Sequence, residues 1–178
     1  MKVMKRTYVI LLTLACLLLW AGSCWSRSLE FDATQAALIK PSTESSEARL
    51  LLQFTLPEIL ANYTIDFACA SFGVNAAGDE GKVSFQAFPL SRAWDARTVS
   101  WTGPWERAGG DWNDRLSAYE ITGAGSGKTV YLDVTDFANG WRKEPSKNFG
   151  IIVKVSGPFL GSFTLDEAQG AAKLRVLY

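Results

Sequence analysis

Short apolar runs interrupted by turn-forming residues dominate this chain and limit its fold more than any other feature. Runs of about four to eight residues, most of them rich in Val, Ile, Phe and Tyr, alternate with clusters of Gly, Asn, Asp, Ser and Pro. Runs of this kind are typical of β-strands, and their close spacing favours an all-β sandwich. The predicted strands are residues 28–33, 49–54, 65–74, 82–90, 98–101, 117–121, 129–134, 149–155, 161–165 and 173–178.

The predicted strands differ in how completely they are covered. Residues 50–54 and 150–155 are almost uniformly apolar, which indicates strands near the centre of a sheet. Residues 82–88 alternate instead, with Phe85 and Ala87 on one face. This alternation predicts a strand with one solvated or partly covered face.

Two short helices are expected between the strands. Residues 56–61 contain a Pro near their start, a position that suits a helix beginning. In residues 135–141 we expect Thr135 to be the N-cap, and Phe137 and Trp141 are four residues apart, so they share one helix face. Both helices are predicted to form a lid over one end of the core.

The N-terminus has the layout of an export signal. Three basic residues within the first six precede an apolar stretch that carries no charge until Arg27. The segment "WAGSC" resembles the bacterial lipoprotein cleavage signal, in which a small residue precedes a Cys that becomes lipidated. We therefore expect residues 1–23 to be a removed signal peptide and Cys24 to be the lipid-modified N-terminus. Two alternatives stay open: an uncleaved membrane anchor, and lipidation at Cys16, which fits the pattern less well.

The remaining residues, 24–178, are predicted to form one domain with a sizeable core. Lipidation would attach this domain durably to a membrane. Residues 25 and 26 lack the Asp that resembles an inner-membrane retention signal, so we expect an exported, membrane-anchored lipoprotein at the outer membrane or cell surface.

One segment looks like a nucleotide-binding loop but departs from the motif. Gly127, Lys128 and Thr129 match the end of a phosphate-binding loop, whereas Thr122 stands where the motif requires its first Gly. The strand rhythm of residues 129–134 follows, so no helix N-terminus would face a phosphate. We predict no nucleotide site.

Composition excludes further classes of function. The chain has 18 basic and 18 acidic residues and no basic run after the signal, so nucleic-acid binding has no electrostatic footprint. It has no His, which removes the commonest metal ligand and the base of a Ser-His-Asp triad. With Cys24 lipidated and the signal removed, only Cys69 remains, so no intramolecular disulfide is expected, and Cys69 is predicted to be a small buried side chain.

Several motifs, in their order and spacing, resemble the DNRLRE domain family, which is similar to disaggregatase-related repeats and to related alginate- and polysaccharide-binding modules. The resemblance implies a jelly-roll-like antiparallel β-sandwich without catalytic machinery. One departure is that "TVSWTGPW" lacks the family's usual Asn-x-x-Pro after the Trp. The matching segments are residues 48–59, 65–74, 88–101, 104–112, 131–154 and 173–178.

Two Trp residues are the candidates for a ligand platform. Trp105 and Trp112 flank the Gly-rich "ERAGGD", where little apolar periodicity predicts burial, and sugars stack on aromatic faces. The alternative is a loop that folds its own Trp side chains onto the sandwich edge. Trp94, Trp101 and Trp141 are expected to be structural. The polar residues beside the two candidate rings are Glu106, Arg107, Asp111, Asn113, Asp114 and Arg115.

The same loop offers oxygen ligands and a pair of carboxylates. Asp111, Asn113 and Asp114 suit calcium, although no EF-hand-like series surrounds them, so calcium stays an alternative to the expectation of no cofactor. The carboxylates also raise the alternative of a glycosidase pair, which the family resemblance argues against.

Together these features predict a non-catalytic, lipid-anchored cell-envelope protein that binds carbohydrate or another extracellular polymer. The alternative is a structural or assembly lipoprotein that binds another envelope protein.

Overall fold

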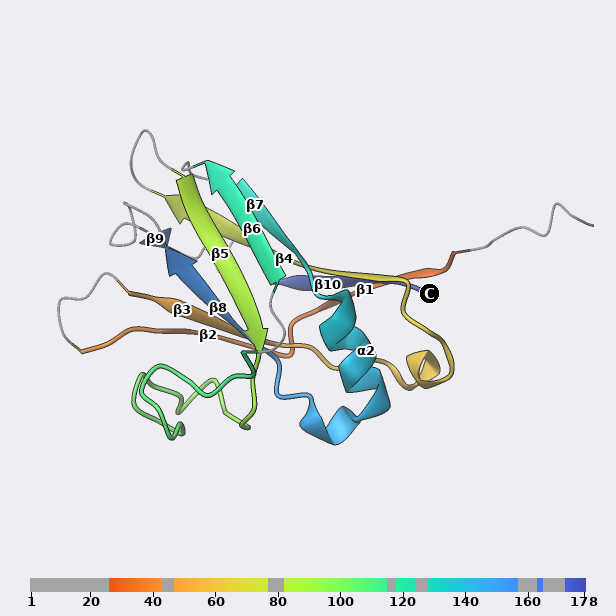
Figure 1. The fold of residues 1–178 in the computed structure, drawn as a ribbon, viewed down its shortest axis with the longest axis horizontal. Coiled ribbons are helices and arrows are strands. Elements are labelled where there is room, and N and C mark those ends of the chain that lie inside the picture. The colour runs from red at the N-terminus through yellow and green to blue at the C-terminus, as the bar shows by residue number, and fades with distance from the viewer. Residues whose placement is uncertain are drawn as a thin grey trace, which may run out of the picture.

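The structure is a computed structural model, and it describes most of the chain after residue 25. The described residues are 26–42, 47–76, 82–114, 118–123, 128–156, 163–164 and 172–178. The predicted signal peptide, Cys24 and Arg115 lie outside them. In the described residues two antiparallel sheets pack face to face (Figure 1), which confirms the predicted all-β sandwich.

The two sheets, named A and B here, have five strands each within the described part of the chain. Sheet A has the order β1-β10-β4-β7, with β9 paired to β4, and sheet B has the order β2-β3-β8-β5-β6. The chain crosses repeatedly between the sheets, as in a jelly roll. Sheet A consists of β1 (Ser28–Asp32), β4 (Phe67–Ala76), β7 (Lys128–Asp133), β9 (Phe163–Thr164) and β10 (Lys173–Leu177). Sheet B consists of β2 (Gln35–Ile39), β3 (Arg49–Gln53), β5 (Lys82–Pro89), β6 (Ala118–Gly123) and β8 (Ile151–Ser156).

The main core fills the space between the sheets. Side chains of one parity on each strand enter it, such as Leu52 on β3, Val153 on β8 and Phe85 on β5, all at most 1 % exposed. Burial of these apolar groups is the main favourable term in folding. The expectation that residues 50–54 and 150–155 lie centrally is confirmed, because β3 and β8 are interior strands of sheet B.

A long loop covers the outer face of sheet B and creates a second core. Leu51, Ile152 and Phe88 point outward from adjacent strands and are buried beneath residues 90–114. This loop appears in green in Figure 1, beside β2 and β3. The cover explains why β3 and β8 read as continuous apolar runs rather than alternating ones.

Two sequence predictions about strands are wrong. Residues 98–101 form no strand; they lie in the covering loop and bond locally, as in Val99 N to Asp95 O at 2.9 Å, because their apolar side chains pack on the sheet. Strand β2 was not predicted, because its Ala-rich sequence carries little β-propensity. Cys69 was expected to be buried but is half-buried. Side chains alternate between the two faces of β4, and Cys69 points away from the core face that holds the buried Ala68 and Ala70.

Three helical segments close one end of the main core: η1 (Glu58–Asn62), α2 (Thr135–Lys143) and η2 (Pro145–Lys147). The predicted pair Phe137 and Trp141 is buried on one face of α2, with ring centroids 6.3 Å apart. Thr135 is not the N-cap; it is the first helical residue, and Asp133 accepts its backbone N–H at 3.0 Å. No helix in the described residues is long and apolar enough to cross a membrane.

Candidate functional site

Asp111, one of the predicted ligand-binding residues, holds together the loop of residues 90–114 that covers sheet B. It is 8 % exposed, and its carboxylate accepts the backbone N–H groups of Glu106 at 2.8 Å and Arg107 at 3.0 Å. Arg92 Nε lies 3.2 Å from the same carboxylate. Burial acts to raise the pKa of Asp111, but the two backbone hydrogen bonds and the charges of Arg92 and Arg107 outweigh it and lower that pKa.

The two glycines before Asp111 allow close packing on the sheet. Gly109 has φ +88°, and its carbonyl accepts Arg49 Nη1 at 2.6 Å. A Cβ on Gly109 would lie 2.3 Å from that nitrogen, and one on Gly110, with φ +116°, would lie 2.7 Å from Ile152 Cδ1. The Gly-Gly-Asp sequence therefore serves the fit between loop and strands.

Trp105 is folded onto the sandwich by its own loop, which was the alternative to an exposed ligand platform. Its ring is 7 % exposed within the second core, and its Nε1 donates to Ser100 O at 2.9 Å. The Trp105 ring packs inside the second core, whereas Trp112 is only half-buried at its edge, so the two rings do not form a shared exposed platform.

Trp112 is half-buried at the edge of the second core, with cations around its ring. Arg107 and Arg49 each lie 5.1 Å from the ring centroid, and Lys154 Nζ lies 5.3 Å from it. The Trp112 indole N–H donates to Asp114 Oδ1. The structure thus brings together three of the predicted residues, namely Trp112, Arg107 and Asp114, in a cation–π cluster.

The predicted calcium ligands do not converge. Asp111 faces the backbone amides of its own loop, whereas Asp114 accepts the Trp112 indole. Among the residues that the structure describes, no group of three or more Cys, Asp or Glu side chains is arranged to hold a metal ion.

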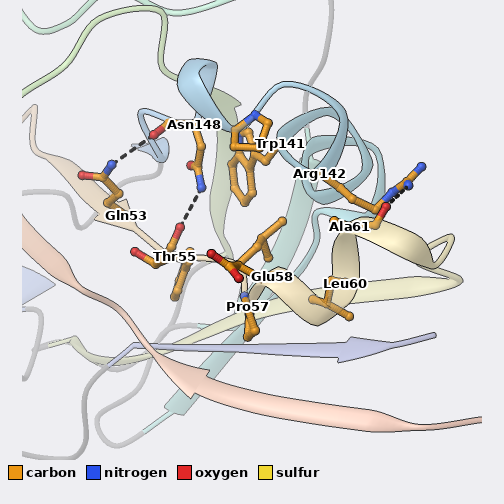
Figure 2. A pocket seen from close by; sticks show the side chains of 12 residues that line it. Gln53, Thr55, Pro57, Glu58, Leu60, Ala61, Trp141, Arg142 and Asn148 are labelled. Carbon is orange, nitrogen blue, oxygen red and sulfur yellow. Dashed lines mark hydrogen bonds between the residues drawn. The ribbon is translucent and has the colours of Figure 1, made fainter.

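A cleft of about 650 Å³ opens between η1 and the α2–η2 segment, at the end of the sandwich that the helices cover. In Figure 2 the Trp141 ring projects from α2 toward Pro57 and Glu58, and Gln53 and Asn148 lie along one side. The apolar wall that a ligand can reach consists of Leu56, Pro57 and the small exposed part of Trp141, with Phe54 and Leu60 fully buried beneath it. The remaining lining residues are Thr55, Ala61, Arg142 and Pro145.

The amide side chains of this cleft are fixed by the main chain. Asn148 Nδ2 donates to Phe54 O at 2.7 Å, and its Oδ1 accepts Gly150 N at 3.2 Å. Gln53 Nε2 donates to Asn148 O at 3.0 Å, and its Oε1 accepts Gln35 Nε2 at 2.8 Å. These bonds hold the polar side of the cleft in place before any ligand arrives.

Other polar groups in the cleft keep hydrogen-bonding capacity. Thr55 and Glu58 are exposed, and neither side chain bonds to another described residue. Arg142 Nη1 donates to Ala61 O at 3.1 Å, and its Nε is buried without an acceptor among the described residues, so Arg142 holds η1 and offers no donor to a ligand. Beside the apolar lining, the exposed Thr55 and Glu58 side chains are the groups available to a ligand.

A smaller cleft, about 390 Å³, lies on the other side of Trp141. Asn113, another predicted site residue, lines it together with Ser91, Asp136 and Phe137. The backbone N–H of Asn113 donates to Pro89 O at 3.0 Å, which anchors the residue at the end of β5.

Sequence reasoning missed the larger cleft, because its walls come from segments far apart in the chain. Gln53 and Asn148 are 95 residues apart. One signal was available in the Asn-x-Gly segment that ends at Gly150, where φ is +85° and an added Cβ would lie 2.2 Å from Leu52 O. That contact fixes Asn148 at the mouth of the cleft.

No protein-family model matches this chain, and no curated protein sequence shows significant similarity to it. The resemblance to DNRLRE domains therefore rests on the sequence motifs alone and stays a prediction.

Proposed function

We propose that this protein is a non-catalytic, lipid-anchored β-sandwich of the cell envelope that binds carbohydrate or another extracellular polymer in the larger cleft. The observation that carries this proposal is that an apolar wall around Trp141 lies beside the fixed side-chain amides of Gln53 and Asn148. A preformed concave site with a few placed polar groups is typical of ligand binding.

The chemistry of the cleft suits a saccharide unit better than a wholly apolar ligand. Sugar rings present C–H surfaces that pack against apolar walls, and their hydroxyls both donate and accept hydrogen bonds. Glu58 supplies an acceptor, and the Thr55 hydroxyl supplies both a donor and an acceptor. Together they match the mixed demands of a polyhydroxylated chain.

The lining also favours binding over hydrolysis. Glycoside hydrolysis in most families needs two carboxyl groups on opposite sides of the scissile bond. Glu58 is the single carboxylate among the 12 residues that line the cleft. We therefore assign retention of the ligand, without chemistry, to this site.

The anchor in this proposal is the lipid on Cys24, formed after removal of residues 1–23. The export layout of the N-terminus and the small residue before Cys24 support it. The described sandwich begins at Ser26, so the anchor would join the domain almost directly.

The test is a glycan-array screen of the purified full chain, with and without calcium, beside Glu58→Ala and Thr55→Val variants. Loss of one hydrogen bond to the ligand, worth about 1–1.5 kcal/mol, corresponds to roughly tenfold weaker binding. Asp32→Asn, an exposed change on β1, is the matched control and keeps full affinity.

Binding that both cleft variants retain would refute the assignment to this cleft. A blank array together with copurification of a stoichiometric envelope protein would favour the structural or assembly function instead. Binding that requires calcium would reopen the predicted metal role of Asp111 and Asp114.

A further inference from the structure

Large apolar side chains are exposed at one end of sheet A. Ile59 on η1 is 49 % exposed, Tyr63 is 41 % exposed, and Phe67 at the start of β4 is 37 % exposed. The Tyr63 ring rests on Tyr178, with centroids 5.1 Å apart. Phe67 pairs with Leu177, the residue before Tyr178, so Phe67 and Tyr63 both lie at the C-terminal end of β10, with Phe67 on the outer face of sheet A. We call Ile59, Tyr63 and Phe67 the aromatic end.

The chain enters the sandwich at this same end. Arg27 N donates to Tyr178 O and Tyr178 N donates to Arg27 O, both at 3.0 Å, so the start of the described chain is bonded beside the aromatic end. Figure 1 shows the start of β1, the C-terminus and η1 at one end of the molecule. Three residues of chain separate Cys24 from Arg27, and a segment of that length spans at most about 10 Å.

We propose that the aromatic end docks on the headgroup region of the membrane that holds the N-terminal anchor. This inference rests on the membrane attachment in the proposed function. Tyr side chains favour the membrane–water interface, where the ring is partly desolvated and the hydroxyl stays hydrated. Attachment through the nearby N-terminus keeps the aromatic end at high effective concentration beside the bilayer, so a small apolar area suffices for contact.

The exposed charged residues near this end in the chain carry no net positive charge. Arg27 is exposed, and the exposed acids Glu58 and Asp66 lie nearby in the chain. An anionic lipid surface therefore gains little electrostatic attraction, and we expect docking to depend on apolar and aromatic contact and to respond weakly to salt.

Docking leaves the larger cleft open. Residues of η1 that line the cleft are Glu58, Leu60 and Ala61, whereas Ile59 and Tyr63 lie outside its lining. The cleft and the aromatic end thus use different sides of η1, and ligand binding would occur close to the membrane surface.

The experiment places a photocrosslinking amino acid, p-benzoylphenylalanine, at Tyr63 of the full chain in phosphatidylcholine vesicles. The matched control carries it at Tyr131, which is 59 % exposed on β7. Flotation of the vesicles first verifies that both proteins are membrane-attached. After irradiation, mass spectrometry is expected to find about tenfold more lipid adduct at position 63 than at 131, because tethering favours contact at the anchored end.

A second variant guards against a local effect of the probe. Ile59→Ser combined with Phe67→Ser removes the remaining exposed apolar groups of the aromatic end and is expected to lower the adduct yield at position 63 several-fold. Retention of the full yield would contradict the docking.

The other outcomes separate the two proposals. Flotation with equal adduct yields at positions 63 and 131 would overturn the docking and leave the anchor in place. A crosslinked dimer at position 63 would show that a second copy of the chain covers this end instead. Failure of the full chain to float would overturn the anchor, and the docking with it.

Discussion

Asp111→Ala tests whether this carboxylate holds residues 90–114 on sheet B. Its two hydrogen bonds, from Glu106 N at 2.8 Å and Arg107 N at 3.0 Å, each contribute about 1.5–3 kcal/mol as bonds to a charged group. The Arg92 side chain is 41 % exposed, so its ion pair adds at most about 1 kcal/mol. Because bonds in one network are not additive, we expect the free energy of unfolding to fall by about 3 kcal/mol.

The stability lost on Asp111→Ala should decrease as the pH falls into the acid range. The pKa of Asp111 is lowered on folding from its ordinary value of 3.8. A lowered pKa means that the ionised carboxylate stabilises the folded state fully above the unfolded value. That stabilisation declines as the pH falls below 3.8 toward the folded pKa. The difference between wild type and Asp111→Ala should therefore be constant at neutral pH and shrink in acid.

Urea unfolding followed by Trp fluorescence, at pH 7 and again near pH 3, measures both quantities. Asp95→Asn is the control in the same loop, because its ion pair with Arg97 is solvent-exposed and local and should contribute little to stability at either pH. A destabilisation by Asp111→Ala that is equally large at both pH values would refute the assignment to the ionised carboxylate.

Two further substitutions have expected outcomes in the same urea assay. Gly150→Ala should lower the free energy of unfolding by roughly 3 kcal/mol or more, because φ is +85° and the new Cβ would meet Leu52 O. The control Gly73→Ala has open space around it and should be tolerated. Equal effects of the two substitutions would contradict the close approach at Gly150. Trp105→Ala should cost about 3–5 kcal/mol as a buried aromatic, and Trp112→Ala should cost less, because its ring is half-buried; the reverse order would contradict the second core.

Much of the fold was predictable from local sequence, because strand patterns are a short-range property. Residues 82–88 alternate, and their strand has Phe85 and Ala87 in the main core as expected. Val99 and Trp101 alternate in the same way, yet they form no strand, because the outer face of sheet B supplies the apolar partner. Periodicity reports which side chains are covered, not what covers them.

The candidate site was less predictable than the fold. Trp105 and Trp112 occupy similar local sequences, and only the position of the loop on sheet B decides that one ring is buried and the other half-exposed. The cleft depends on contacts such as Arg142 Nη1 to Ala61 O, between residues 81 apart. A single sequence carries no direct signal for such pairs, whereas the Gly-Gly-Asp segment was visible and its role proved to be holding the loop.

Segment η1 links the proposed polymer-binding cleft to the proposed membrane contact, because its residues face the core, the cleft and the aromatic end. Leu60 is fully buried in the main core and fixes the segment in place. Glu58 and Ala61 face the cleft, and Ile59 lies outside it at the aromatic end. A five-residue 3-10 helix has little stability of its own, so its position depends on Leu60 and on the Arg142 bond to Ala61 O. Under the two proposals, membrane contact at Ile59 would restrain the same segment that shapes the cleft and would couple polymer binding to attachment at the membrane.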